Sequence, residues 1–169
     1  MAIGFSASPP TKLLPFLKYD AREARLLRID RDAQGVVAED ITQNFAAVVD
    51  METIKVGWML FGRHARPDLR LFPLGEPWPE APSQAHRRGL RVVMQLSQAH
   101  GGEARELCST ASQFLAAFDA LHDDYLAGRI DNPGKLPVVV LTRVEPGAQP
   151  EFTIAGWVNR SEALAVLAT

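Results

Sequence analysis

Residues 44–61 are the feature that most constrains the fold, because they read as two strands joined by a short polar turn at residues 50–53. In the second run two sets of side chains alternate, Ile54, Val56, Trp58 and Leu60 on one face and Lys55, Gly57, Met59 and Phe61 on the other. The first set is wholly apolar, so the pattern predicts that this face meets the core. A glycine within a strand often marks a bulge or the close approach of another segment or ligand, which we expect at Gly57.

The length and composition indicate one domain covering residues 1–169. The chain is 47% hydrophobic and 22% charged, values typical of a globular domain with a real core. The net charge of −2 does not indicate a nucleic-acid-binding protein, although a local cationic patch is enough for binding. The single cysteine, Cys108, excludes an internal disulfide and a cysteine-based zinc site.

Three segments follow one another along the chain. Residues 1–17 are expected to form an irregular arm, because Pro9, Pro10 and Pro15 break regular structure. Residues 18–160 hold the predicted barrel and helix, and residues 161–169 hold a short C-terminal helix capped by Ser161. No apolar stretch approaches the ~20 residues that cross a bilayer, and the N-terminus does not read as a secretion signal. We therefore expect a soluble, cytoplasmic protein without a membrane partner.

Alternating or continuous apolar runs predict further strands. A hairpin is expected at residues 24–31 and 36–41, with its turn at residues 32–35, and single strands are expected at residues 69–74, 136–144 and 151–158. Residues 86–96 start with basic side chains and continue as a predicted strand, in which Leu90, Val92, Met94 and Leu96 share one face. Residues 103–107 read either as a short return strand or as the approach to a helix.

The clearest helix covers residues 110–127. Its apolar side chains recur at spacings of three and four and form one stripe, namely Ala111, Phe114, Leu115, Phe118, Leu121, His122 and Tyr125. Thr110 and Gln113 fit a capping box at the start, and Gly128 is the expected stop.

A proline-rich loop at residues 75–82 carries Trp78. Three prolines in this segment exclude a helix or a central strand, so we expect a long, stiff surface loop with an exposed tryptophan. Long loops in compact domains are often functional. Trp78 therefore either contacts a partner or packs on one end of the barrel.

The sequence contains no recognisable catalytic motif. It lacks a phosphate-binding loop and a nucleophile elbow, and its one local cluster of possible metal ligands is His122, Asp123 and Asp124. On a helix the two carboxylates rotate away from the histidine, so these residues do not chelate one ion. Cys108 has no neighbouring base and is expected to be a structural thiol. We predict a protein that is not an enzyme and has no metal or cofactor.

Basic and aromatic residues interleave between residues 55 and 91 and are the candidate contacts for nucleic acid. The cations are Lys55, Arg63, Arg66, Arg70, Arg88 and Arg91, and the aromatic residues are Trp58, Phe61, Phe72 and Trp78. Cations neutralise the phosphate backbone, and rings stack on bases at roughly 1–3 kcal/mol each. Alternation cannot place Trp58 and Phe61 on the same face, so at least one should be core. Two alternatives remain. These residue types also dominate protein interfaces, so the segment could contact another protein, or the cations are simply solvated and the aromatic residues belong to the core.

Several short pieces resemble, in the same order, a family of short uncharacterised proteins encoded by phages and bacterial prophages. These pieces are residues 14–20, 40–45, 55–58, 131–137 and 152–158. The general layout is similar to that of phage single-stranded-DNA-binding proteins of the OB-fold type. Many of those proteins end in an acidic tail that recruits replication partners, whereas this chain ends in the apolar residues 163–169.

The residues and the resemblance together predict an α+β, β-rich fold: a twisted antiparallel OB-like barrel of about six to eight strands. The 110–127 helix would plug one end, and a short helix would follow at the C-terminus. The leading hypothesis for function is non-catalytic binding of single-stranded DNA in phage replication or recombination. The alternative is an oligomeric protein-interaction or phage assembly module, in which the arm and the Trp78 loop pack on other copies of the chain.

Overall fold

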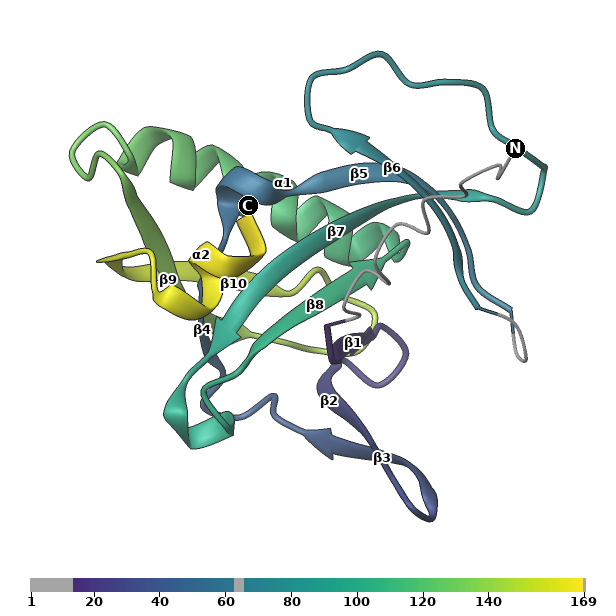
Figure 1. Ribbon diagram of the computed structural model, residues 1–169, viewed down its shortest axis with the longest axis horizontal. Coiled ribbons are helices and arrows are strands. Elements are labelled where there is room, and N and C mark those ends of the chain that lie inside the picture. The colour runs from purple at the N-terminus through teal and green to yellow at the C-terminus, as the bar shows by residue number, and fades with distance from the viewer. Residues whose placement is uncertain (1–13, 63–65, 169) are drawn as a thin grey trace, which may run out of the picture.

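In the computed structural model, which describes residues 14–62 and 66–168, one mixed sheet of ten strands is covered by two helices (Figure 1). The first six strands are β1 (Phe16–Asp20), β2 (Arg25–Asp32), β3 (Gly35–Asp40), β4 (Ala46–Val49), β5 (Lys55–Leu60) and β6 (Asp68–Pro73). The others are β7 (Arg87–Leu96), β8 (Ala104–Ser109), β9 (Lys135–Arg143) and β10 (Glu151–Asn159). The helices are α1 (Ser112–Gly128) and α2 (Glu162–Ala168).

The sheet branches at β7. The main path runs β10-β9-β4-β7-β8-β1-β2-β3, and β5 joins the same strand β7, with β6 beyond it. Residues 87–91 of β7 pair with β5, and residues 94–96 pair with β4. Every pair is antiparallel except β1 with β8, which are parallel.

The predicted β-rich fold with one long helix and a short C-terminal helix is confirmed, but the sheet does not close. Within the described residues its outer strands, β3 and β10, do not pair with each other, so closure into a barrel is not observed. The predicted strands at residues 24–31, 36–41, 69–74, 136–144 and 151–158 correspond to β2, β3, β6, β9 and β10. Residues 104–107 belong to a return strand, β8, which resolves the alternative left by the sequence for residues 103–107.

The predicted C-terminal end of the N-terminal arm is wrong, because the last residues assigned to the arm belong to a strand. Phe16 and Leu17 belong to β1, which lies between β2 and β8. The Glu106 N–H also donates to the Pro15 carbonyl at 3.0 Å. The positions of the prolines did not predict this strand, because its parallel partner comes from the distant segment at residues 106–107. The part of the predicted arm at residues 1–13 lies outside the described residues.

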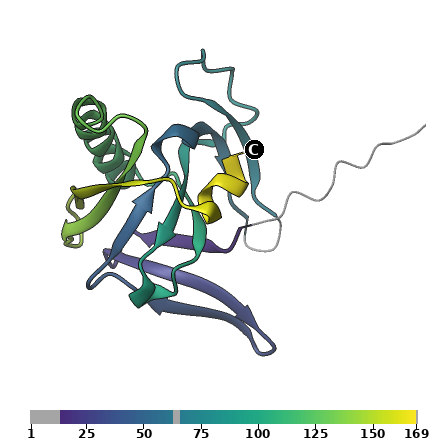
Figure 2. The ribbon, with the colours of Figure 1, turned by 60° about the vertical axis from the view of Figure 1, so that its left-hand side comes forward.

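Alternation along β7 divides the core between the two helices, which lie on opposite sides of the sheet (Figure 2). Val92 is fully buried in the cluster that contains Phe114 and Phe118 of α1. Val93, the next residue, packs instead with Leu164 of α2. The predicted face of residues 90, 92, 94 and 96 is therefore confirmed as the side that meets the long helix.

The ends of the long helix differ from the prediction. Ala111 is the N-cap and receives no side-chain cap, so the capping box of Thr110 and Gln113 is wrong. Instead the hydroxyl of Ser109 accepts the Ala111 N–H at 3.1 Å, which turns the chain out of β8. Gly128 is the last helical residue rather than the stop beyond it. The Ser161 cap is confirmed, because its hydroxyl accepts the Leu164 N–H at 3.3 Å.

The buried face of β5 also differs from the prediction. The deepest side chain is Met59, which is 1% exposed, whereas Val56, Trp58 and Leu60 of the predicted core face are only half-buried. The reason is that the other face of β5 packs closely against its neighbours. A Cβ placed on Gly57 would lie 2.0 Å from the Arg70 carbonyl oxygen of β6. The predicted close approach at Gly57 is therefore confirmed.

Two arginines join distant segments by ion pairs. Arg105 of β8 is 1% exposed and donates to the backbone carbonyls of Phe16 and Ile29 and to the carboxylate of Asp30, so it binds β1 and β2 to β8. Arg160 lies between β10 and α2 and donates with both terminal nitrogens to the carboxylate of Asp50, which follows β4. Arg105 therefore joins three neighbouring strands, and Arg160 joins the segment after β10 to the segment after β4.

Candidate nucleic-acid interface

The register of β5, β6 and β7 decides which candidate residues share a face. Trp58 of β5 lies opposite Arg70 of β6 and opposite Arg88 of β7. Side chains directly opposite in antiparallel strands project from the same side of the sheet. Trp58, Arg70 and Arg88 therefore form one group, and it lies on the side that α1 covers, since Arg88 lines a cavity together with residues of α1.

Trp78 folds back onto this group. Its ring meets Trp58 edge-on with centroids 5.6 Å apart, and meets Phe72 edge-on at 4.8 Å. The indole N–H of Trp58 donates to the Pro79 carbonyl at 2.9 Å. The expectation of an exposed Trp78 is therefore wrong: the side chain is half-buried because the 75–82 loop packs on its own strands.

Arg88 completes the group as a cation over two rings. Its guanidinium carbon lies 4.5 Å from the centroid of the Trp78 ring and 5.4 Å from that of the Trp58 ring. Such contacts stabilise the cation while leaving its N–H donors free for other partners. Among the described residues the guanidinium has no hydrogen bond or ion pair, which makes it available to an anion.

The remaining candidate residues lie elsewhere. Lys55 and Arg91 are opposite each other on the reverse side of the sheet, and Arg91 donates to Glu106 at 2.8 Å. Arg66 is exposed before β6, and Phe61 follows the end of β5 with 49% of its surface exposed. Arg63 lies outside the described residues. The ten candidates therefore do not share one face, because neighbouring positions on a strand alternate between its two sides.

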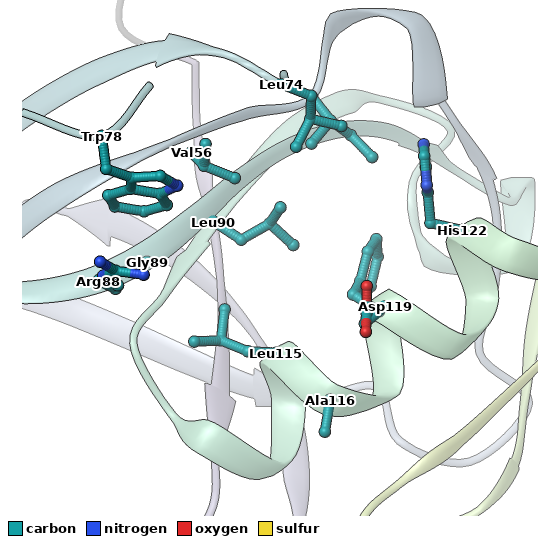
Figure 3. A pocket seen from close by; sticks show the side chains of 12 residues that line it. Val56, Leu74, Trp78, Arg88, Gly89, Leu90, Leu115, Ala116, Asp119 and His122 are labelled. Atoms are coloured by element: carbon teal, nitrogen blue, oxygen red, sulfur yellow. The ribbon is translucent and has the colours of Figure 1, made fainter. Parts of the chain in front are cut away.

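A cavity of about 500 Å³ adjoins the aromatic group, between α1, the Trp78 loop and strands β5 and β7 (Figure 3). Its apolar walls include Val56, Leu90, Leu115 and Phe118. Its polar lining residues are Arg88 on the strand side and Asp119 and His122 on the helix side. Sequence reasoning missed Asp119, although its spacing from Leu115 and His122 places the three on one helix face.

A chain of hydrogen bonds holds the proline-rich loop against β6. The Ser83 hydroxyl lies 2.6 Å from Nδ1 of His86, and Nε2 of His86 lies 3.0 Å from the Asp68 carboxylate. The order of these groups is that of a hydrolase triad. However, the Ser83 hydroxyl also accepts the Ala85 N–H at 3.2 Å, and none of the three residues lines the cavity. We interpret the chain as a clamp on the loop.

The clamp makes the docking of the loop sensitive to acid. His86, and then Arg70, hold the pKa of the Asp68 carboxyl below its usual range. A carboxyl whose pKa is lowered on folding contributes stability above its unfolded pKa of about 3.9, and that contribution is lost as the pH falls through the folded value. We expect constant tryptophan emission from pH 7 to about pH 4.5 and a red shift below about pH 4.

Asp68→Ala is expected to shift the tryptophan emission to the red already at pH 7, because the imidazole loses its carboxylate partner. Glu80→Ala, which removes an exposed carboxylate from the 75–82 loop itself, is the control and should leave the emission unchanged. Far-UV circular dichroism confirms that each variant is folded. Identical emission of Asp68→Ala and the unaltered protein across the pH range would show that this contact does not hold the loop.

The other reactive side chains offer little chemistry. Burial, with a smaller effect of Glu106, raises the pKa of the Cys108 thiol to about 12, so the thiolate is scarce at neutral pH. Within residues 14–62 and 66–168, no three His, Cys, Asp or Glu side chains are arranged to hold a metal ion. In the same part of the chain, neither helix has the length and apolar character needed to cross a bilayer.

Comparisons with protein families, curated proteins and solved structures gave no match to this chain.

Proposed function

We propose that this chain binds single-stranded DNA, without catalysing a reaction on it, through Trp58, Phe72, Trp78, Arg70 and Arg88, here called the Trp–Arg surface. The observation that carries the proposal is the position of Arg88. Its guanidinium lies over two indole rings and, among the described residues, has no hydrogen-bonding or ionic partner of its own. A cation held beside aromatic rings is the arrangement that binds a phosphate and its base together.

Charge and exposure support a path for the strand along this surface. The Arg70 side chain is 59% exposed and pairs only loosely with Asp68, at 3.4 Å, so a phosphate could compete for it. Among the described strands β6 pairs only with β5, so this surface lies at an open edge of the sheet, which supports a binding face there. We propose that this binding serves phage replication or recombination, a part of the proposal that depends only on the resemblance of short sequence pieces to phage and prophage proteins.

Titration of the intrinsic tryptophan fluorescence with a thymidine oligomer tests the proposal at low and moderate salt. We expect quenching that weakens with salt, because phosphate contacts release counterions. Arg70→Ala and Arg88→Ala should each weaken binding and reduce the slope of log affinity against log salt by about 1. Arg143→Ala is the matched control for Arg70, since its side chain is 60% exposed and pairs with a carboxylate at the same 3.4 Å.

The proposal is contradicted if the folded protein shows no quenching at low salt, or if both arginine variants keep full affinity. The oligomeric module would then be the remaining candidate. In addition to the arm and the Trp78 loop, it could use the edge of β3, which among the described strands pairs only with β2 and whose residues are all exposed, with Val36 at 62% and Val37 at 46%. Sedimentation of the same samples would measure the oligomeric state directly.

A further inference from the structure

We infer that the cavity beside the Trp–Arg surface receives one base of the bound strand and selects a base that carries an amino group next to an unprotonated ring nitrogen. Cytosine and adenine have this edge, whereas thymine has a carbonyl in place of the amino group. The inference rests on the proposed function, and it adds a specificity that backbone contacts and stacking do not supply.

The walls of the cavity suit a flat heterocycle. The volume of about 500 Å³ exceeds that of one base, and the lining on both sides is apolar, with Val56 and Leu90 from the strands and Leu115 and Phe118 from α1. Burial of a base ring against these side chains removes apolar surface from water. Trp78 also lines the cavity, so its ring lies where it can contact the base.

The polar groups on the helix side match the amino edge. Asp119 and His122 project from the face of α1 that borders the cavity (Figure 3), and among the described residues neither makes a hydrogen bond. An ionised carboxylate only accepts hydrogen bonds, and a neutral imidazole carries one N–H donor. The amino group would donate to Asp119, and the imidazole of His122 would donate to the neighbouring ring nitrogen. A thymine would turn a carbonyl oxygen toward the carboxylate.

Arg88 connects this cavity to the surface. It lines the cavity and also lies over the Trp58 and Trp78 rings. A phosphate on Arg88 therefore leaves its own base within reach of the cavity, while the rest of the strand stays on the surface. Taking a base out of a stack costs least in a single strand, which agrees with the proposed substrate.

The test compares oligo(dC) with oligo(dT) of equal length at the same salt concentration, by titration of tryptophan fluorescence. We expect the unaltered protein to bind oligo(dC) at least about fivefold more tightly, because thymine lacks the amino group that would donate to Asp119. Asp119→Ala should bring the ratio of the two affinities close to one. Asp123→Ala makes the same change of charge one turn along α1, away from the cavity, and should keep the preference.

A second test fills the cavity with a larger side chain instead of removing its carboxylate, and it has its own control variant. Ala116 lines the cavity and Ala120 does not, although both are exposed on α1. Ala116→Phe should abolish the preference for oligo(dC) and leave the affinity for oligo(dT) within about twofold, whereas Ala120→Phe should change neither.

The outcomes separate this inference from the proposed function. Equal, salt-dependent binding of both oligomers by the unaltered protein overturns the base site and leaves the strand-binding surface intact. A preference for oligo(dC) that survives both Asp119→Ala and Ala116→Phe also overturns the base site. Failure to bind either oligomer overturns the base site and the proposed function together.

Discussion

Gly57→Ala is expected to destabilise the protein by about 3 kcal/mol, the upper end of what overpacking usually costs. The added Cβ would lie 2.0 Å from the Arg70 carbonyl oxygen, 2.8 Å from the Arg70 carbonyl carbon and 2.9 Å from the Leu71 Cα. All three atoms are backbone, so no change of side-chain rotamer relieves the clash. The strands β5 and β6 would have to separate. Urea unfolding followed by circular dichroism measures the loss.

Gly156→Ala is the matched control for this change. Gly156 also lies within a strand, β10, but a Cβ there would have no heavy atom within 4 Å. Alanine restricts the unfolded chain more than glycine does, so this variant should be unchanged or more stable by up to about 1 kcal/mol. Equal unfolding midpoints for the two variants would show that β6 does not approach Gly57 as closely as described.

Arg160→Ala is expected to cost about 3 kcal/mol, because it leaves a buried carboxylate without its cation. Asp50 is 2% exposed, and both of its carboxylate oxygens accept from Arg160. The same guanidinium donates to Glu52 at 2.7 Å, but that side chain is 52% exposed and can return to water. The Arg160 side chain is itself 21% exposed, so we place the cost at the lower end of the range for buried pairs.

Two further variants define how this loss arises. Arg143→Ala removes an exposed pair and should cost less than about 1 kcal/mol in the same unfolding experiment. Replacing both partners, Asp50→Leu with Arg160→Met, should recover part of the stability lost in Arg160→Ala, because no buried charge then remains unpaired. If Arg160→Ala costs no more than Arg143→Ala, the pair does not join β4 to the segment before α2.

Local patterns were sufficient for most elements of the fold. The apolar stripe that contains Phe114, Phe118 and Leu121 predicts α1, and the alternation in residues 90–96 predicts which side chains of β7 share the face that meets α1. Pairings between distant segments were not predictable. Phe16 and Leu17 carry no local strand signal that survives the nearby prolines, and their strand forms because β8 and β2 lie on either side of it.

The candidate site was predictable in its residue types and not in its arrangement. Alternation assigns each side chain to a face of its own strand, but it does not say which faces of β5, β6 and β7 coincide. The register unites Trp58 with Arg70 and Arg88 and separates them from Lys55 and Arg91. Asp119 carried no signal by itself, because its role depends on a cavity that α1 and the strands form together.

The order of strands in the sheet has a consequence for how the protein folds as the ribosome makes it. The inner strand β4 pairs with β7 and β9, so both of its edges wait for segments synthesised much later, and β1 waits in the same way for β8 on one of its edges. The early chain can pair β1 with β2, β2 with β3 and β5 with β6, and small isolated sheets of this kind are marginally stable. The nascent protein therefore holds unpaired strand edges until β9 has emerged, and its exposure to aggregation is greatest before synthesis ends.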